Sequence, residues 1–401
     1  MPENDILEVD MGYVSDSKIT NFDFHSYIPY TKAFNNNDEI RICVQQTDVY
    51  PYLHESFLYI EGDIEDKDKV KLGNNGLSFL FEQVRLELNG IEIDSSRMLG
   101  ITSSIKGYLS STPDNYYCYE NAGWTFKNSS SISDTNGHFT ACIPLKYWLG
   151  FFEHYRKFLL NSRIELILTR SNSDLNALIK KSDDATTGSV NIKNIVWKVP
   201  HVSVDDSQRL KLMKIVEKEK HLFIPFRSFE TYTYPELGDT KNVLWNLKTS
   251  TKLEKPRYII VGLQKNRNNS ITADKSEFDH SKLKNIKVFL NSNVYPYDNL
   301  NLDFTHNDFT LLYNMYTSFQ ESYYENGLRN PILSPKLFLS NAPIIVLDVS
   351  KQNDSEISST IDLRLEIEAD DNLTGVSAYC MLIHDRIVEY SPFTREVRKL
   401  V

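Results

Sequence analysis

Nine histidines are the side chains of this sequence best suited to bind a metal ion or to transfer protons. They are His25, His54, His138, His154, His201, His221, His280, His306 and His384. No two are separated by a single residue, the spacing that would place two ligands on one face of a strand. The nearest donor pairs are Asp279-His280 and His384-Asp385, but adjacent strand residues point to opposite faces. We therefore expect no metal site.

Carboxylate pairs also occur, but their surroundings are those of turns. Asp63–Asp68, Asp183-Asp184 and Asp370-Asp371 lie in polar stretches, so charged loop tips are expected there. Common catalytic and nucleotide-binding motifs are absent: no G-x-x-x-x-G-K-[ST], no G-x-G-x-x-G after a strand, no H-E-x-x-H and no G-x-S-x-G. The sequence thus predicts no catalytic, cofactor-binding or metal-binding residue, and a protein that is not an enzyme.

The cysteines and the net charge limit the class of protein further. Cys43, Cys118, Cys142 and Cys380 are far apart and form no C-x-x-C pair, which predicts buried free thiols in a reducing compartment. The net charge of −10 disfavours a general electrostatic grip on nucleic acid. Because the first ten residues carry four acidic side chains and no basic one, no secretory signal is expected.

Short extended phrases bounded by Gly, Asn, Asp and Pro dominate the chain. Val84–Leu88 alternates apolar and polar residues, and Asn89-Gly90 after it predicts a hairpin into Ile91–Ile93. The strands expected in the first half are Asp23–Pro29, Glu39–Gln46, Ser56–Ile64, Phe79–Leu88, His138–Ile143, Arg163–Thr169 and Asn191–Val199. Those expected in the second half are Leu222–Ser228, Leu244–Thr249, Arg257–Leu263, Asn285–Leu290, Ala342–Asp348, Thr360–Glu368 and Ser377–Tyr390.

Four segments have helical instead of extended spacing. Met98–Leu109 and Leu145–Leu160 are expected helices of the first half, and Phe309–Tyr323 takes the place of Met98–Leu109 in the second. Asp205–Lys220 joins the halves; because two glutamates interrupt its lysines, we interpret it as a solvated linker helix, with a basic nucleic-acid-binding helix as the alternative. Arg395–Lys399 is expected to be a frayed tail.

Five phrases of the first half recur in the same order in the second half, at offsets of 196 to 202 residues. The pairs are Ile28–Tyr30 with Ile224–Phe226, Leu58–Gly62 with Ile259–Gly262, Val84–Gly90 with Ile286–Ser292, Ala141–Leu145 with Asn341–Ile345, and Ile164–Leu168 with Ile361–Leu365. Each match alone is weak, because strands draw on few residue types. Their constant order and offset predict two copies of one β-rich domain.

The length of the chain, 401 residues, suits two domains of about 200 residues. About eight strands per half, with short helices in loops, predict an all-β tandem double jelly roll made of two eight-stranded antiparallel sandwiches. Immunoglobulin-type domains would need only about 100 residues each. The predicted units are residues 1–204, a connector at 205–217, and residues 218–401.

Aromatic residues are abundant, with 23 Tyr and 21 Phe. Many Tyr fall in expected loops and at helix edges, in Val49–Tyr52, Tyr232–Pro235, Val294–Tyr297 and Tyr313–Tyr324. Tyr outside a core is typical of subunit interfaces. A carbohydrate-binding platform would use the same residues, and core packing accounts for some of them. This pattern therefore does not distinguish another protein subunit from a carbohydrate as the partner.

Phrases along nearly the whole chain resemble proteins encoded by virus-derived elements in invertebrate genomes. They are Ala122–Trp124, Ile143–Leu145, Glu165–Arg170, Ile195–Trp197, Trp245–Ser250, Glu254–Tyr258, Leu290–Ser292, Tyr295–Tyr297 and Ala378–Arg386. We associate these proteins with the double jelly-roll major capsid proteins of the adenovirus–Polinton lineage, by general similarity and without a diagnostic motif. Many animal members are longer, so this chain resembles a compact form with little room for large loops.

The resemblance implies two upright jelly rolls per chain and three chains per pseudo-hexagonal capsomer of an icosahedral shell. The implied partners are further copies of the chain, first as a homotrimer and then between capsomers, together with a penton or minor capsid protein. No cofactor and no sequence-specific nucleic-acid binding are implied. The implied location is the virion, after synthesis in the host cell without secretion; a membrane beneath the shell is left open. The alternative is a tandem jelly-roll glycan-binding or glycan-cleaving protein.

Overall fold

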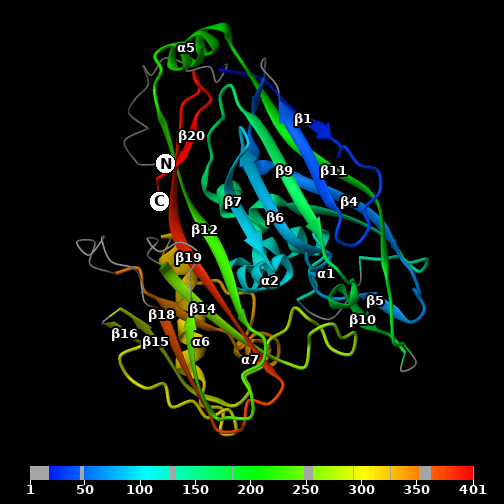
Figure 1. Ribbon diagram of the computed structural model, residues 1–401, viewed down its shortest axis with the longest axis vertical. Helices are drawn as coiled ribbons and strands as arrows, with labels where there is room; N and C mark the ends of the chain where they lie inside the picture. The colour runs from blue at the N-terminus through cyan, green and yellow to red at the C-terminus, as the bar shows by residue number, and fades with distance from the viewer. Residues whose placement is uncertain are drawn as a thin grey trace, which may run out of the picture.

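Antiparallel strands are the main regular secondary structure of the protein. The structure is a computed structural model that describes residues 18–45, 49–126, 132–182, 185–247, 256–291, 293–325, 327–351 and 363–400. Two strand-rich halves lie against each other, the first in blue to green and the second in green to red (Figure 1). Each expected strand overlaps a strand of the structure, with ends that differ by a few residues.

The first half folds into two principal sheets, here called the first roll. One sheet has the order β1-β11-β4-β8 and contains β1 (Ile19–Tyr27), β11 (Val190–Val204), β4 (Phe57–Ile64) and β8 (His138–Pro144). The other has the order β2-β9-β6-β7 and contains β2 (Glu39–Gln45), β9 (Arg163–Arg170), β6 (Phe81–Leu88) and β7 (Ile91–Arg97). The short β3 (Tyr50–Pro51) pairs with β11, and β5 (Val70–Leu72) pairs with β10 (Leu178–Lys180).

The second half, here called the second roll, also has two sheets. One has the order β12-β19-β14-β17 and contains β12 (Leu222–Tyr234), β19 (Val376–Tyr390), β14 (Pro256–Lys265) and β17 (Ile345–Asp348), with β20 (Val397–Lys399) beside β19. The other has the order β13-β18-β15-β16 and contains β13 (Asn242–Leu247), β18 (Leu363–Ala369), β15 (Leu283–Leu290) and β16 (Asn293–Tyr295).

The two rolls share one topology. Counted within each roll, without the short β3, β5, β10 and β20, the eight strands stand in the orders 1-8-3-6 and 2-7-4-5 in both halves. In the third strand of the first roll, β4, every second residue is buried, as expected for a sheet with one face on the core. The predicted all-β tandem double jelly roll, with two eight-stranded antiparallel sandwiches, is confirmed.

Three of the five repeated phrases occupy matching places in the two rolls. Leu88 and Leu290 each end the fourth strand and precede a two-residue turn, and Gly62 and Gly262 both lie in the third strand. The Ile164 phrase and its echo both fall in the seventh strand, although residues 361 and 362 lie outside the described residues.

The other two matches were wrong in register. Ile28–Tyr30 follows the first strand, whereas Ile224–Phe226 lies near the beginning of the equivalent strand β12. Likewise Pro144 ends the sixth strand, whereas Pro343 precedes it. The small residue alphabet of strands explains both errors, since similar phrases arise at opposite ends of equivalent strands.

The helices that position the contact between the rolls follow the fifth strand of each. These are α2 (Leu99–Ser110), after β7, and α6 (Thr310–Tyr324), after β16, both close to expectation. The connector contains α5 (Asp206–Glu217), whose N-cap Asp205 accepts a hydrogen bond from the Gln208 N–H at 2.6 Å. None of its residues is buried, as expected for a solvated helix, and it lies at one end of the molecule (Figure 1).

The helix expected over Leu145–Leu160 is mostly absent. The structure has a 3-10 turn at Leu145–Tyr147 and the short α4 (Gly150–His154), and Tyr155 after it is extended. Trp148, Phe151 and Phe152 are buried all the same. The helical spacing of these aromatic residues therefore reflects burial on several sides and not a continuous helix.

Other local elements were missed or misjudged. The tail at Arg395–Lys399 is not frayed, because Val397–Lys399 forms β20 against β19. The segment 342–344, expected as strand, follows α7 (Pro335–Asn341), which begins with a Ser334 cap and a proline, a recognisable start signal. Helices α1 (Gly76–Phe79) and α3 (Tyr116–Asn121) are too short to show a period. No helix of the described ranges is long and apolar enough to cross a membrane.

Candidate assembly interface

The first strand of the second roll, β12, is enclosed by the first roll. The Phe226 ring packs on Phe151 of α4 in an edge-to-face contact, with 5.5 Å between ring centroids. Further along, the Thr231 hydroxyl lies 2.7 Å from the hydroxyl of Thr102 on α2. Long strand β12 thus runs beside β7 of the other roll (Figure 1), and the two rolls bury a shared seam.

Helix α4 approaches β12 so closely that its first residue has to be glycine. A β-carbon placed on Gly150 would lie 1.7 Å from the carbonyl oxygen of Arg227 and 3.4 Å from the Phe229 ring. No side chain fits at the first of these distances without moving the backbone of one element. The contact between the rolls therefore includes a close approach of their main chains.

A fully buried carboxylate, Asp94 on β7, joins the rolls beside this contact. It accepts hydrogen bonds from the Ser228 hydroxyl at 2.7 Å and from the Phe151 N–H at 3.0 Å. Burial raises the pKa of Asp94, and the nearby Arg386 guanidinium opposes that change. Asp94 thus ties β7 and α4 of the first roll to β12 of the second.

The two equivalent helices α2 and α6 also meet in the seam. The Tyr316 hydroxyl of α6 donates to the Tyr108 carbonyl of α2 at 2.9 Å. The Gln320 amide donates to the carbonyls of Leu109 and Ser111, at 3.2 and 3.0 Å. These bonds satisfy carbonyls at the C-terminal end of α2, which have no partner within their own helix.

A buried ion pair lies next to the two helices. The Lys106 ammonium donates to Glu153 at 2.9 Å and stands 4.5 Å from the centroid of the Tyr323 ring. The hydroxyls of Tyr323 and Tyr324 also donate to Glu153, at 3.0 and 2.8 Å. Burial opposes ionisation of Glu153, but Lys106 and these hydrogen bonds outweigh it and hold the pKa of Glu153 below its ordinary value.

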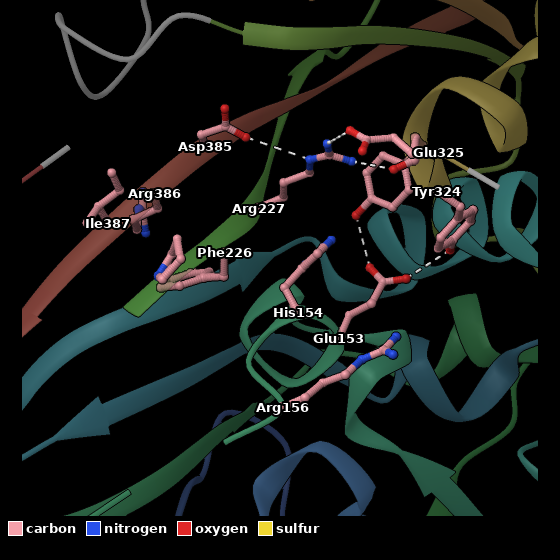
Figure 2. A pocket seen from close by; sticks show the side chains of 12 residues that line it. Glu153, His154, Arg156, Phe226, Arg227, Tyr324, Glu325, Asp385, Arg386 and Ile387 are labelled. Atoms are coloured by element: carbon pink, nitrogen blue, oxygen red, sulfur yellow. Dashed lines mark hydrogen bonds and ion pairs between the residues drawn. The ribbon is translucent and has the colours of Figure 1, made fainter. Parts of the chain in front are cut away.

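A cavity of about 550 Å³ opens beside this ion pair. Figure 2 shows Arg227 reaching across it between Asp385 and the C-terminal end of α6. The Arg227 guanidinium donates to the Tyr323 carbonyl at 2.6 Å, lies 4.5 Å from the Tyr323 ring and stands 3.7 Å from Asp385. Besides Glu153, whose pKa is lowered, the lining of this cavity contains Glu325 and Asp385, and no Ser, Thr or Cys of the described residues.

The side chains of the two candidate histidine–carboxylate pairs have different partners; strand geometry accounts for this at His384-Asp385 on β19, whereas Asp279-His280 lies before β15 and not in a strand. His384 is buried, whereas Asp385 on the other side of β19 accepts from Arg257 at 2.7 Å. Asp279 is bound by Arg267, while the His280 ring stacks on Phe304. Within the described ranges, no group of three or more His, Cys, Asp or Glu side chains could hold a metal ion.

The carboxylates expected at loop tips have mixed outcomes. Asp370 and Asp371 do lie in the turn after β18, but Asp63 lies within strand β4, where it accepts from His138 at 2.9 Å. Asp183 and Asp184 lie outside the described residues.

All four cysteines are free, but only Cys380 is buried and Cys118 is exposed. The expectation of four buried thiols was therefore wrong.

Many of the aromatic side chains are buried within the folded protein and are not on its surface. Tyr108, Tyr316 and Tyr323 are buried in the seam between the rolls, and Tyr258 packs on α6. The first two anchor α2 against α6. Tyr297, in contrast, is 90% exposed. The subunit interface expected from the Tyr-rich segments stays a prediction, because Tyr316 and Tyr323 of these segments lie in the contact between the two halves of one chain.

The seam residues Lys106, Glu153 and Asp94 were not identified from the sequence. Lys106 is the one basic residue in an otherwise apolar and small-residue helix, and that contrast is a signal that could have marked it. Glu153 and Asp94 stand among aromatic and polar residues with no comparable signal. Their roles depend on partners that are distant in the sequence.

The chain is similar to known proteins over nearly its whole length. The profile of the double jelly roll-like domain family matches residues 70–388. The Sputnik virophage structure aligns at 10% identity and a TM-score of 0.66, covering 97% of this chain and 90% of that one. The Faustovirus major capsid protein aligns at 11% identity and a TM-score of 0.62, covering 96% and 92%. The mavirus major capsid protein aligns at 10% identity and a TM-score of 0.54, covering 98% and 92%.

No curated protein matches the chain by sequence. At identities of 10 to 11%, the structural likenesses establish the fold alone. The family match covers most of the chain, and it includes strands of both rolls together with the seam between them. The chain belongs to the double jelly roll-like domain family.

Proposed function

We propose that this protein is a viral major capsid protein, a structural building block whose homotrimer forms a pseudo-hexagonal capsomer of an icosahedral shell. The observation that carries the proposal is the duplicated jelly roll, which aligns end to end with capsid proteins and leaves neither side with a large unmatched segment. Three copies of a chain with two equivalent rolls place six similar bodies around one axis.

The rest of the proposal follows from this architecture. The protein would act in the virion after synthesis in the host cell without secretion. Its partners would be other copies of itself and a penton or minor capsid protein, with no cofactor, no sequence-specific nucleic-acid binding and no enzymatic activity. The assignment to the adenovirus–Polinton lineage, in an element of an invertebrate genome, rests on the resemblance of the sequence phrases.

The boundaries of the two units also belong to the proposal. We infer units at 1–204 and 218–401 with a connector at 205–217. They are supported by the place of α5, Asp206–Glu217, and by the sheets of the described residues, none of which mixes strands from both sides of α5.

The mass of the purified protein in solution tests the proposal. Light scattering should give three times the chain mass of 46.5 kDa, and negative-stain images of concentrated samples should show hexagonal plates or closed particles. A protein that remains monomeric at micromolar concentration, across salt and pH, would remove the capsid proposal. It would leave the glycan-binding or glycan-cleaving alternative, which an array of immobilised glycans would then test.

A further inference from the structure

The seam inside the chain shows how one roll receives another. The first strand of the second roll, β12, lies beside the fifth strand of the first roll, β7, and the helix that follows it, α2. Ser228 of β12 donates to Asp94 of β7, and Thr231 of β12 contacts Thr102 of α2. Residues on both sides of β12 are therefore covered, and Phe226 and Phe229 are buried.

The equivalent first strand of the first roll, β1, has no such cover from the described residues, which begin at residue 18. It pairs with β11 along one edge, yet none of its nine residues is buried. Phe22 and Phe24 are exposed on it, and directly after it Ile28 and Tyr30 are each 71% exposed. Isolated exposed apolar residues are ordinary, but four within the nine positions from Phe22 to Tyr30, on an edge strand and directly after it, are typical of an interaction surface.

The equivalent receiving surface of the second roll is also unoccupied by any described residue. It lies between the fifth strand, β16, and the helix that follows, α6. Here a groove of about 230 Å³ is lined by Tyr295 and Pro296, by residues of α6 that include Asn314, Met315 and Ser318, and by Tyr258 of β14 and Val346, Leu347 and Asp348 of β17.

Two exposed apolar side chains flank this groove. Tyr297 follows Pro296 and is 90% exposed, and Leu311 is 56% exposed. Leu311 lies three, four and seven residues before the groove-lining residues of α6, so it is on the same face of that helix. The second roll thus presents an apolar groove at the place where the first roll holds β12.

We propose that β1 of one copy of this protein docks into the groove between β16 and α6 of a second copy, as β12 contacts β7 and α2. The contact of β12 with α4 has no counterpart among the described residues, because the segment after β17 is described only to residue 351. This inference rests on the proposed function and adds to it the faces that meet. Each chain has one strand and one groove that no described residue of the same chain covers. The strand of one chain therefore meets the groove of the next, which is a head-to-tail contact. A head-to-tail contact closes into a ring only for a suitable rotation between neighbours, and the proposed trimer requires that three chains bring six rolls together around one axis.

The contact between the two rolls of one chain also indicates which residues stabilise the proposed contact between two chains. Aromatic and aliphatic side chains that fill a groove dominate the binding energy of such interfaces. Phe24 and Ile28 on the strand side, with Tyr297 and Leu311 on the groove side, are the exposed members of the two surfaces. Charged substitutions there should prevent association, because an unpaired carboxylate would be buried on binding.

Two double variants test the pairing. F24D with I28D removes the strand side, and L311D with Y297D removes the groove side. Each variant alone should have the mass of a monomer by light scattering, with an unchanged circular dichroism spectrum. An equimolar mixture should form a dimer, because the first variant keeps its groove and the second keeps its strand, and it should not extend further. L210D, at an exposed position of helix α5, is the matched control and should remain trimeric.

The outcomes separate this inference from the proposed function. A wild-type protein that is itself monomeric overturns the proposed function. A trimeric wild type with either double variant still trimeric overturns the docking of β1 into this groove while the capsid proposal stands. Two monomeric variants that fail to form a dimer when mixed also overturn it, because they would show that the two faces do not meet each other.

Discussion

Lys106 and Glu153 form a buried ion pair at the point where three parts of the chain meet. The lysine comes from α2 and the glutamate from α4, while the hydroxyls that complete the site come from α6 of the other roll. Removing both charges from water costs several kcal/mol per ion, so such a pair adds little net stability. Both charges belong to the first roll, and the second roll adds the Tyr323 and Tyr324 hydroxyls that complete the hydrogen bonds of Glu153.

Breaking this pair from one side should be costly. Glu153→Gln leaves the Lys106 ammonium buried without a counter-charge, so we expect a loss of about 3–5 kcal/mol in the free energy of unfolding, measured by urea denaturation. Glu396→Gln is the control, since it breaks an exposed pair with Arg398 and should cause no measurable change. Equal stability of the two variants would contradict the role given to Glu153.

Lys275 is a second buried basic side chain, and no carboxylate of the described residues forms an ion pair with it. Its ammonium donates to Gln264 at 2.8 Å and to the Tyr379 hydroxyl at 2.9 Å, and it also contacts Asn268. Burial, with a contribution from Arg267, lowers the pKa of Lys275 to about 7. In the unfolded chain this pKa returns to its ordinary value of 10.5.

The pKa of Lys275 makes stability depend on pH with a definite sign. Above pH 7 the unfolded chain binds a proton that the folded protein has released, so the free energy of unfolding rises with pH. The free energy of unfolding of the wild type minus that of Lys275→Met should increase by up to about 1.4 kcal/mol per pH unit from pH 7 to 9. Titrations of tyrosines and of Cys380 are common to both proteins and cancel. A flat or falling difference would show that Lys275 stays charged.

At the scale of elements, the approach of α4 to β12 determines the seam. Gly150→Ala places a methyl group against the Arg227 carbonyl, which neither main chain can avoid without a shift. We expect a loss at the upper end of about 1–3 kcal/mol, with a lower melting temperature in calorimetry. Gly238→Ala is the matched control: its φ of +86° is strained for alanine, but no atom lies within 4 Å. The account fails if Gly238→Ala costs more than Gly150→Ala.

Strands and their order of appearance could be predicted because their signal is local. The alternation of Val84–Leu88 and the turn at Asn89-Gly90 fix a hairpin without knowledge of the rest of the chain. The two-residue turn is present, with Leu88 opposite Ile91. Longer buried stretches carry no such period, which is why the aromatic run from Leu145 was interpreted as a helix and is mostly irregular.

The contact surfaces could not be predicted in the same way. Asp94 and Ser228 are 134 residues apart in the sequence, and Lys106 and Tyr324 are 218 apart. No local pattern records which residues meet across the seam. The tyrosine-rich segments did indicate an interface, but the structure was needed to show that Tyr316 and Tyr323 serve the contact between the rolls and that Tyr297 faces outward.

At the scale of the whole molecule, the charge should control the later steps of assembly. The chain carries a net charge of −10, so trimers would repel one another at low ionic strength. Raising the salt concentration from about 10 mM to about 500 mM shortens the Debye length several-fold and should shift the protein from free trimers to larger particles. Dynamic light scattering would follow this change, and dissociation of particles by added salt would contradict it.

The central claim is that three chains build one ring of six rolls. An electron-microscopic reconstruction of the purified oligomer, computed without imposed symmetry, tests it most directly. The account predicts a threefold particle with a pseudo-hexagonal outline, in which six similar densities surround the axis and the seam within a chain resembles the contact between chains. A monomer, or an oligomer whose rolls do not alternate around a threefold axis, would contradict it.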